Sequence, residues 1–457
     1  MPALAAGAAR AAYSLLTVAA QPLLRRKLRR RGATEPGYLE AIDERFGRYA
    51  AAADEAIAPG VPAGAAASDG PRVWLHAVSL GETRAAAILV AALRERLPDL
   101  RLLLTHGTAT GRAEGARLLR PGDLQAWQPW DTPEAVGRFL DAFRPAAGLL
   151  METEVWPNLV DGCARRGIPL ALVNARLNER SLRGARRLGW LSRPAYGALS
   201  LALPQSAADA ARLRSLGAPV AAPTGNLKFD AAPDPARLAA GARWRSALDR
   251  PVVLLASARE GEEAMLADRL VALRRPGGAP GAVRWMVVPR HPQRFDEAEA
   301  LLRARGLSVA RRSAWADDGP AADAQARAAD VWLGDSLGEM ALYYRLAAVA
   351  LLGGSFAGFG GQNLIEAAAC GCPVVMGAST FNFAEASAQA EQAGAALRVD
   401  GMAAGVAAAV ALATDGARHA AAVRAAQAFS AAHRGAAVRT VEALLPLLER
   451  AGAARRA

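Results

Sequence analysis

Cysteine and histidine are scarce in this 457-residue sequence, which contains three cysteines and five histidines. Cys163, Cys370 and Cys372 form no CxxC pair, and no histidine clusters with them in the sequence. Because structural zinc sites and disulfide frameworks need grouped cysteines, the sequence predicts neither. A few unpaired thiols are typical of a protein in a reducing compartment.

Acidic and aromatic residues are also few. The 43 Asp and Glu are outnumbered by 55 Lys and Arg, which gives a net charge of +12, and aromatic residues make up 5% of the chain. A basic protein can bind nucleic acid, anionic lipid or a phosphorylated substrate, and an arginine-rich composition also follows from a GC-rich genome. Binders of single-stranded nucleic acid interleave exposed aromatic side chains with basic ones. The sequence has no such cluster, so we expect no nucleic-acid partner.

Only one apolar run approaches membrane length, and it lies at the N-terminus. Residues 3–24 carry a single charge, Arg10, and residues 25–31 (RRKLRRR) hold six basic side chains. A cleavable signal peptide has its positive charges before the apolar run, so this order argues against one. About 20 residues can cross a bilayer, but so much alanine equally suits an interfacial helix with its arginines on anionic headgroups. A helix packed on the protein itself is the third interpretation. The positive-inside rule keeps the arginines in the cytoplasm, so we expect a membrane anchor over residues 1–31 on the cytoplasmic face.

Strand and helix patterns alternate from residue 72 onward. Apolar runs begin near residues 72, 101, 147, 169 and 199, and the series restarts near residues 252, 284, 329, 348 and 373. Such alternation predicts parallel sheets covered by helices on both faces. A segment rich in Pro and Gly, residues 217–235, separates the two series. We therefore expect an α/β fold with two Rossmann-like domains facing a central cleft: an N-terminal domain over 32–222, and a C-terminal domain with terminal helices over 223–457.

Three carboxylates follow strands of the first half. Glu82 lies where the turn after VWLH enters a helix, and Glu152 and Glu154 lie in METE at the end of another strand. Side chains two residues apart on an extended chain share a face, and two carboxylates in a core need hydroxyl or cationic partners. We expect them at the carboxyl ends of the strands, where such sheets bind ligands, with a surface loop as the alternative. Glu82 either stabilises the helix dipole or deprotonates an attacking hydroxyl group.

Basic and glycine-rich segments follow strands of the second half. Arg290 and His291 lie between a strand and a helix, where a basic pair can meet an anion. Residues 353–377, GGSFAGFGGQNLIEAAACGCPVVMG, place two glycine pairs before a helix. Their amides can hold phosphate, or the glycines merely permit tight turns. Asn363 and Glu366 share one face of that helix, where a carboxylate can accept hydrogen bonds from both hydroxyls of a ribose.

Taken together, these segments resemble the Kdo transferases (3-deoxy-D-manno-octulosonic acid transferases), which build the inner core of lipopolysaccharide. No single segment is decisive, but the set runs in family order over most of the chain. The matching segments are PGYLEAIDERFG (36–47), WLHAVSLGET (74–83), METEVWPN (151–158), VNARLNERS (173–181), GNLKFD (225–230), VVPRHPQRF (287–295) and the glycine-rich segment 353–377.

The resemblance implies a GT-B fold held at the inner membrane by its N-terminal segment. It implies inverting transfer of Kdo from CMP-Kdo to a lipid A precursor, with no metal and no other cofactor. The partners it implies are therefore CMP-Kdo, the lipid A precursor and the anionic membrane surface. It makes Glu82 the general base and Glu152 its partner in the acceptor site.

On the donor side, the resemblance implies that Arg290 meets the CMP phosphate. Gly354 and Ser355 lie at the nearby turn, and Asn363 and Glu366 hold the donor, with Glu366 at the ribose. Weaker candidates for lining the site are Ser257, Lys228, Gly338 and Met340.

Four positions depart from the usual family pattern. Gln362 and Arg259 stand where histidine is frequent, and Ala367 and Ala378 stand where proline is common. They concern details of the donor loop.

The first alternative function is a membrane-associated GT-B glycosyltransferase that uses a UDP-sugar. A sugar-nucleotide epimerase shares the fold but has no use for an anchor, and a non-catalytic membrane scaffold needs none of these site residues.

Overall fold

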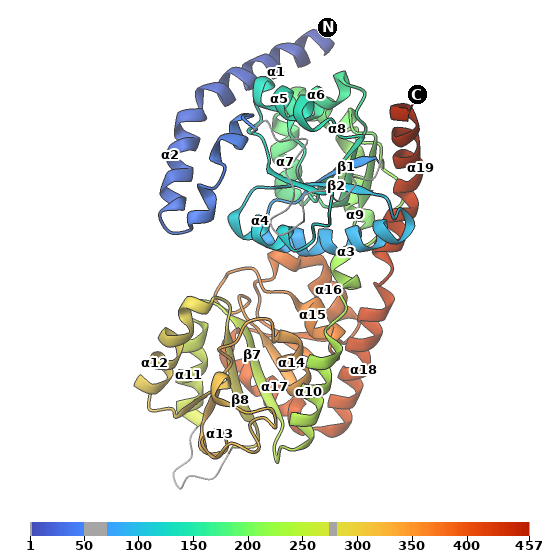
Figure 1. Cartoon of the computed structure of the whole chain (residues 1–457). Helices are drawn as coiled ribbons and strands as arrows, with labels where there is room; N and C mark the ends of the chain where they lie inside the picture. The colour runs from blue at the N-terminus through green and yellow to red at the C-terminus, as the bar shows by residue number, and fades with distance from the viewer. Residues whose placement is uncertain (1, 50–70, 274–280, 457) are drawn as a thin grey trace. The chain divides into compact units, whose positions relative to one another are not determined.

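The computed structural model describes residues 2–49, 71–273 and 281–456, which form two compact units (Figure 1). The first unit consists of residues 1–230 together with 435–457, and the second of residues 231–434. Each unit is built on one parallel sheet with helices on both faces, as the alternation of strand and helix patterns predicts.

Six strands form the sheet of the first unit, in the order β3-β2-β1-β4-β5-β6. The chain runs from β1 outward to β3 and then returns to β4 on the other side, so the strand order reverses between β1 and β4. The strands are β1 (Arg72–His76), β2 (Arg101–His106), β3 (Leu124–Trp127), β4 (Ala147–Met151), β5 (Leu170–Ala175) and β6 (Leu201–Pro204). The helices along this part are α3 (Leu80–Arg96), α4 (Ala109–Ala116), α5 (Pro133–Phe143), α6 (Pro157–Arg165), α7 (Glu179–Arg187), α8 (Gly189–Gly197) and α9 (Ala207–Ser215).

Alternate side chains of β1 enter two different cores. Val73 and Leu75 pack against α3, whereas Trp74 packs with residues of α5 and α6 on the other face. Because both faces are covered, the strands are largely apolar, and every residue of β4 and β5 is buried.

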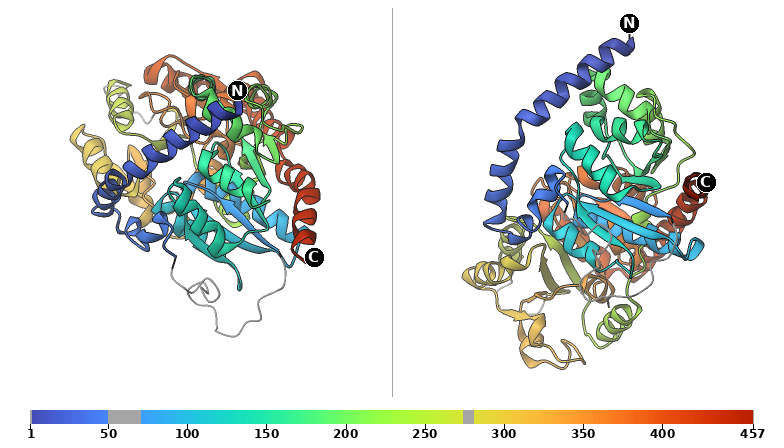
Figure 2. Two further views of the ribbon diagram at one scale, coloured as in Figure 1. Left: turned by 90° about the horizontal axis from the view of Figure 1, so that it is seen from above. Right: turned by 45° about the horizontal axis from the view of Figure 1, so that its top comes forward.

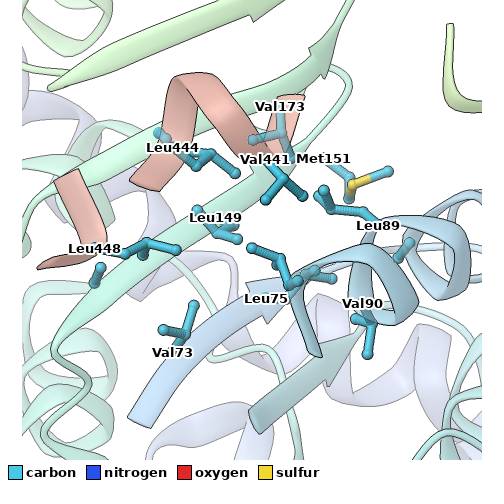
Figure 3. Close-up of a cluster of buried hydrophobic side chains, with 14 of the residues drawn as sticks. Val73, Leu75, Leu89, Val90, Leu149, Met151, Val173, Val441, Leu444 and Leu448 are labelled. Atoms are coloured by element: carbon cyan, nitrogen blue, oxygen red, sulfur yellow. The ribbon is translucent and has the colours of Figure 1, made fainter. Parts of the chain in front are cut away.

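The last helix, α19 (Ala436–Arg456), completes the first unit (Figure 3). Its apolar residues Val441, Leu444 and Leu448 pack on the same side of the sheet as Val73 and Leu149. Asp230 binds the start of this segment, accepting hydrogen bonds from the amides of Gly435 and Ala437, both at 2.6 Å. The sequence analysis assigned residues 223–457 to the second domain. The contacts instead assign 223–230 and 435–457 to the first, because the apolar face of α19 is buried there.

Seven strands form the sheet of the second unit, in the order β13-β12-β11-β7-β8-β10-β9. Its first strand, β7, lies between β8 and β11, so the order reverses between β7 and β11. The strands are β7 (Val252–Ala258), β8 (Arg284–Pro289), β9 (Val309–Arg311), β10 (Val331–Leu333), β11 (Val349–Leu352), β12 (Val374–Met376) and β13 (Ala396–Arg398). The helices are α10 (Pro235–Ser246), α11 (Glu262–Leu273), α12 (Phe295–Ala304), α13 (Ala324–Ala328), α14 (Met340–Leu346), α15 (Leu364–Ala369), α16 (Ala384–Gln392), α17 (Gly401–Thr414) and α18 (Gly416–Ala432).

The N-terminal segment forms two helices at the surface of the first unit, α1 (Pro2–Ala19) and α2 (Gln21–Gly32) (Figure 2). Helix α1 packs against α6 and α8. Across residues 2–49, 71–273 and 281–456, none of the helices combines the length and the apolar character that a bilayer crossing needs. The predicted membrane anchor is therefore not confirmed.

Candidate active site

The carboxylates singled out in the first unit lie where its strand order reverses. Glu82 follows β1, and Glu152 and Glu154 follow β4, the strand paired with β1. In open α/β sheets the crevice at such a reversal, outside the carboxyl ends of the strands, is the usual ligand site. The structure therefore brings these three side chains to the edge predicted from the sequence.

Glu82 lies in the first turn of α3 and folds back onto the preceding loop. Its carboxylate accepts a hydrogen bond from the amide of Val78 at 2.8 Å and another from the hydroxyl of Ser79 at 3.1 Å. Ser79 caps the helix in return by accepting from the amide of Glu82. This reciprocal pair is the local reason for the helix to begin here, and it fixes the position of the carboxylate.

The surroundings of Glu82 favour its protonated form. Burial is the largest cause, and the charge of Glu152 is the next, while the hydrogen bond from Val78 opposes both. Together these effects raise the pKa of Glu82 from 4.5 to about 7. A carboxyl group with a pKa near the working pH is well matched to accept and release a proton during a reaction.

Glu152 is buried and held by two cations. Its carboxylate pairs with Nε of Arg176 at 2.7 Å and with Nζ of Lys228 at 3.2 Å. Its backbone has a φ of 55°, so the chain turns away from β4 here and is no longer extended. This conformation is strained for a residue with a side chain, and such strain often occurs at functional sites. Arg176 was missed in the sequence, although it directly follows β5.

Glu154 takes a separate set of partners. It accepts a hydrogen bond from Nε1 of Trp156 at 2.8 Å, and its carboxylate lies 4.0 Å from Nε2 of the buried His76. Burial, followed by the charge of His106, lowers the pKa of His76 to about 3, so its ring is neutral at pH 7. Burial also raises the pKa of Glu154. The two carboxylates of METE are thus satisfied in different ways, Glu152 by cations and Glu154 mainly by an indole.

The segment that carries Lys228 is fixed by Asn174. The side-chain oxygen of Asn174 accepts a hydrogen bond from the amide of Leu227 at 3.1 Å. Asn174 is fully buried near the end of β5 and has a φ of 50°, a conformation that asparagine tolerates better than most residues. The hydrogen bond from Leu227 to Asn174 fixes the backbone next to Lys228, and this places the Lys228 side chain beside Glu152.

In the second unit, the predicted donor residues also gather where the strand order reverses. Ser257 lies near the end of β7, Arg290 follows β8, and Gly354 and Ser355 follow β11. The end of β7 and the loop after β11 approach closely: a Cβ atom on Gly353 would lie 2.3 Å from the carbonyl oxygen of Ser257. Glycine is therefore required at this position by contact between the two backbones.

A cluster of cations surrounds His291. Burial is the main cause that lowers its pKa, and the charges of Arg290, Arg259 and Arg294 lower it further. The effect of three arginines on one imidazole indicates a positive potential at this edge of the sheet. An anionic group is the natural ligand for such a place.

Asn363 and Glu366 occupy the start of α15, as expected from their spacing. Asn363 caps the helix by accepting from the amide of Ile365 at 3.2 Å, and Glu366 follows in the first turn. Arg290 reaches this segment, since its Nε donates to the side chain of Gln362 at 3.2 Å. Arg290, Asn363 and Glu366 thus belong to one connected region of the second unit.

Gly338 and Met340 flank Glu339 at the start of α14. Gly338 has a φ of 75°, and Glu339 is buried in a network with Arg237, Arg312, Ser336 and Tyr343. The structure therefore shows a turn after β10 that this network fixes in place.

The glycine-rich turn after β11 differs from expectation. The hydroxyl of Ser355 donates to the carbonyl of Leu352 at 2.5 Å and accepts from the amide of Gly377 at 2.8 Å. The amide of Gly354 donates to the carboxylate of Glu262 at 2.7 Å. Both groups are engaged inside the protein, whereas the sequence suggested that this turn offers its amides to phosphate. Glu262 was missed because a glutamate in a first helical turn is common for electrostatic reasons alone.

Comparison with known proteins gives a consistent result. Residues 40–231 match the family model described as 3-Deoxy-D-manno-octulosonic-acid transferase (kdotransferase). A 3-deoxy-D-manno-octulosonic acid transferase of Bordetella pertussis is 49% identical over 396 residues, which are 85% of this chain and 88% of that protein.

Two solved structures share the fold. A glycosyltransferase from Rickettsia africae ESF-5 is 9% identical with a TM-score of 0.53, over 84% of this chain and 99% of that one. A putative UDP-N-acetylglucosamine 2-epimerase from Listeria monocytogenes is 15% identical with a TM-score of 0.52, over 83% and 97%. The fold of this chain, two parallel-sheet α/β domains, thus resembles that of GT-B glycosyltransferases. Because a transferase and an epimerase share this fold, the fold alone does not separate the two activities.

Proposed function

Because the chain belongs to the 3-deoxy-D-manno-octulosonic acid transferase family, we propose that it transfers Kdo from CMP-Kdo to a hydroxyl group of a lipid A precursor. The observation that carries the mechanism is Glu82, a half-buried carboxyl group with a pKa of about 7 at the strand reversal of the first unit. Its ability to take a proton near neutral pH is what activation of a sugar hydroxyl requires.

In the proposed reaction, the acceptor oxygen forms a bond to the anomeric carbon of Kdo. The bond between that carbon and the phosphate oxygen of CMP breaks, and the electron pair leaves with CMP. The proton of the acceptor hydroxyl passes to Glu82. Attack on the face opposite the leaving group inverts the anomeric centre, so a single base is sufficient.

Glu152 is proposed to bind the acceptor beside the base. Its negative charge also helps to raise the pKa of Glu82, so it contributes to the basicity of that group. Arg176 and Lys228 stabilise Glu152 as a carboxylate in a buried position, where an unpaired charge would be unfavourable. Lys228 thus acts on the acceptor side, through Glu152.

On the donor side, Arg290 and Arg259, both beside His291, are proposed to bind the phosphate of CMP. Arg294 is left out of this site, because Glu263 and Glu297 already pair with it. Arg290 and Arg259 would stabilise the charge that develops on the phosphate as the Kdo bond breaks. Asn363 and Glu366 are proposed to hold the rest of the donor, with Glu366 at the ribose hydroxyls. Because fixed cations supply this stabilisation, we expect transfer to need no metal ion.

We further propose that α1 and α2 lie in the interface of an anionic membrane on its cytoplasmic side. The polar face of α1 binds the protein: Tyr13 donates to Asp131 and Ser14 donates to Asn158, both at 2.9 Å, and Arg10 pairs with Asp161. Its apolar residues point outward instead, with Leu15 72% exposed and Leu16 70% exposed. A helix with its apolar face away from the protein is matched to a lipid surface.

Two features near α1 also support binding of this surface to a membrane. Trp190, in helix α8 beside α1, is 74% exposed, and tryptophan is favoured at membrane interfaces. A groove along α2 is lined by Pro22, Ala33 and four arginines, Arg25, Arg26, Arg29 and Arg30. Arginines beside exposed apolar side chains suit anionic lipid headgroups.

Release of CMP tests the proposed reaction. Purified protein is incubated with CMP-Kdo, with and without a tetra-acylated lipid A precursor, and CMP and the lipid product are measured. Release of CMP that depends on the acceptor supports the proposal. No turnover of CMP-Kdo, together with turnover of a UDP-sugar on the same acceptor, would assign the protein to the alternative class of transferase.

A further inference from the structure

Glu262 is a fully buried carboxylate that binds the backbones of two loops in the second unit. It lies at the start of α11, just after β7, and none of its surface is exposed. One oxygen accepts hydrogen bonds from the amides of Arg259 at 2.8 Å and Gly354 at 2.7 Å. The other accepts from the amides of Phe356 at 3.0 Å and Ala357 at 3.3 Å.

These four amides come from both sides of the strand reversal. Arg259 belongs to the loop after β7, and residues 354–357 belong to the loop after β11, the strand paired with β7. Converging backbone amides make an anion-binding concavity of the kind that holds phosphates. Here a carboxylate of the protein itself fills that concavity. The loop amides at these positions are therefore used to bind the two loops together.

The bound loop in turn supports the residues proposed to hold the donor. The carbonyl of Gly354 accepts from the amide of Gly361 at 3.0 Å, and the carbonyl of Gly353 accepts from the amide of Gln362 at 2.9 Å. The side chain of Gln362 binds Arg290, and Asn363 follows it at the start of α15. A continuous series of hydrogen bonds thus leads from Glu262 to the donor-binding region.

We propose that Glu262 is a positioning residue for the nucleotide-sugar donor. Its carboxylate fixes the loops after β7 and β11 so that Arg290 and Asn363 stand in the conformation that binds the donor. It does this through Gly354 and the segment 361–363, without touching the donor. This inference rests on the proposed function, because it assumes that the second unit binds CMP-Kdo.

Substitution of Glu262 by glutamine tests the role with little change in size. The side-chain oxygen of glutamine can still accept hydrogen bonds, but its NH2 group can only donate. Some of the four backbone amides would then have no acceptor, so the loop should lose its fixed conformation. We expect the KM for CMP-Kdo and the Kd for CMP to rise about tenfold, while kcat and the KM for the acceptor stay within about twofold of wild type. A residue with only a structural role would lower the melting temperature and the active fraction and leave both affinities unchanged.

Glu263→Gln is the matched control. Glu263 is equally buried, but it pairs with Arg294 at 2.9 Å and takes no part in the loop. This variant should lose stability and keep its donor KM within about twofold of wild type. An unchanged donor KM and CMP affinity in folded Glu262→Gln would overturn the inference.

A second variant and a wild-type measurement cover the cases in which Glu262→Gln alone gives no answer. If Glu262→Gln does not fold, Glu262→Asp carries the test, because it retains the charge but not the reach to all four amides. A raised donor KM in that variant supports the inference, and a wild-type value overturns it. Wild-type protein that neither binds CMP nor turns over CMP-Kdo would instead refute the proposed function, which separates the two failures.

Discussion

Replacement of Glu82 by glutamine should strongly lower the rate of catalysis and, at alkaline pH, stabilise the protein. Glutamine keeps the size of the side chain and an oxygen that can accept from the amide of Val78, but it cannot take a proton. Loss of a general base lowers turnover by roughly 10²- to 10⁴-fold. Because the change lies in the first unit, and CMP is proposed to bind the second, the affinity for CMP should stay the same.

The effect on stability follows from the raised pKa. The pKa of Glu82 is about 7 in the folded protein and 4.5 for an ordinary glutamate, a difference of about 2.5. Between these values the folded state holds more protons than the unfolded state, so the free energy of unfolding falls as the pH rises. At about 1.4 kcal/mol per pH unit, the total loss is about 3 kcal/mol, and it is complete above pH 7. Glutamine has no charge to bury and avoids this loss.

Rates of CMP release and melting temperatures, measured from about pH 5 to about pH 8, check both expectations. Wild-type activity should rise with pH as Glu82 loses its proton, and the residual activity of Glu82→Gln should not. The melting temperature of the variant should exceed that of wild type by a few degrees at about pH 8, and the difference should shrink toward about pH 5. Glu95→Gln, an exposed change in the same helix, is the control. A wild-type rate in Glu82→Gln, or a stability difference independent of pH, would refute the reasoning.

Four further outcomes are expected. Lys228→Ala removes one cation from Glu152 and should raise the KM for the acceptor about tenfold with CMP affinity unchanged; steady-state kinetics with an unchanged acceptor KM would contradict this. Arg290→Ala should weaken CMP binding by roughly 10- to 100-fold in calorimetry, and wild-type affinity would exclude Arg290 from the phosphate site. The double change Leu15→Glu and Leu16→Glu should reduce binding to anionic vesicles about tenfold without lowering the melting temperature, and full vesicle binding would argue against the lipid surface. Excess EDTA should leave turnover unchanged, and a loss reversed by one divalent metal would show that transfer needs a metal ion.

Much of the fold follows from the sequence because long apolar strands in covered sheets leave a clear pattern. The ten apolar runs beyond residue 72 correspond to strands, but β3, β9 and β13 were not predicted. These strands have three or four residues, and each contains a polar or basic one (Gln125, Arg311 and Arg398), so no continuous apolar run marks them. The helical tail was predicted, yet a helical pattern does not tell which sheet its apolar face will cover. That choice depends on tertiary contacts, and α19 was consequently assigned to the wrong unit.

The residues of the candidate site also fall into two groups: some are recognisable from their own sequence segment, and others depend on partners that lie far along the chain. Glu82 and Glu152 were found because each directly follows a strand, and the same rule would have identified Arg176 after β5. Glu262 could not be found this way, because its partners Gly354 and Phe356 lie 92 and 94 residues further along the chain. The pKa of Glu82 also depends on burial and on a neighbouring carboxylate, neither of which is visible in its own sequence segment.

Because α19 belongs to the first unit, the second unit can be completed before the first during synthesis. Residues 231–434 contain every strand of the second sheet and leave the ribosome as a whole before α19 is made. The first unit has all of its strands much earlier, but part of its core consists of Val441, Leu444 and Leu448. Until those residues emerge, the sheet face that α3 covers in part stays open over β4 and β5, where α19 packs. The domain that is made first must therefore be the last to reach its native core, and loss of the final helix would damage the N-terminal domain.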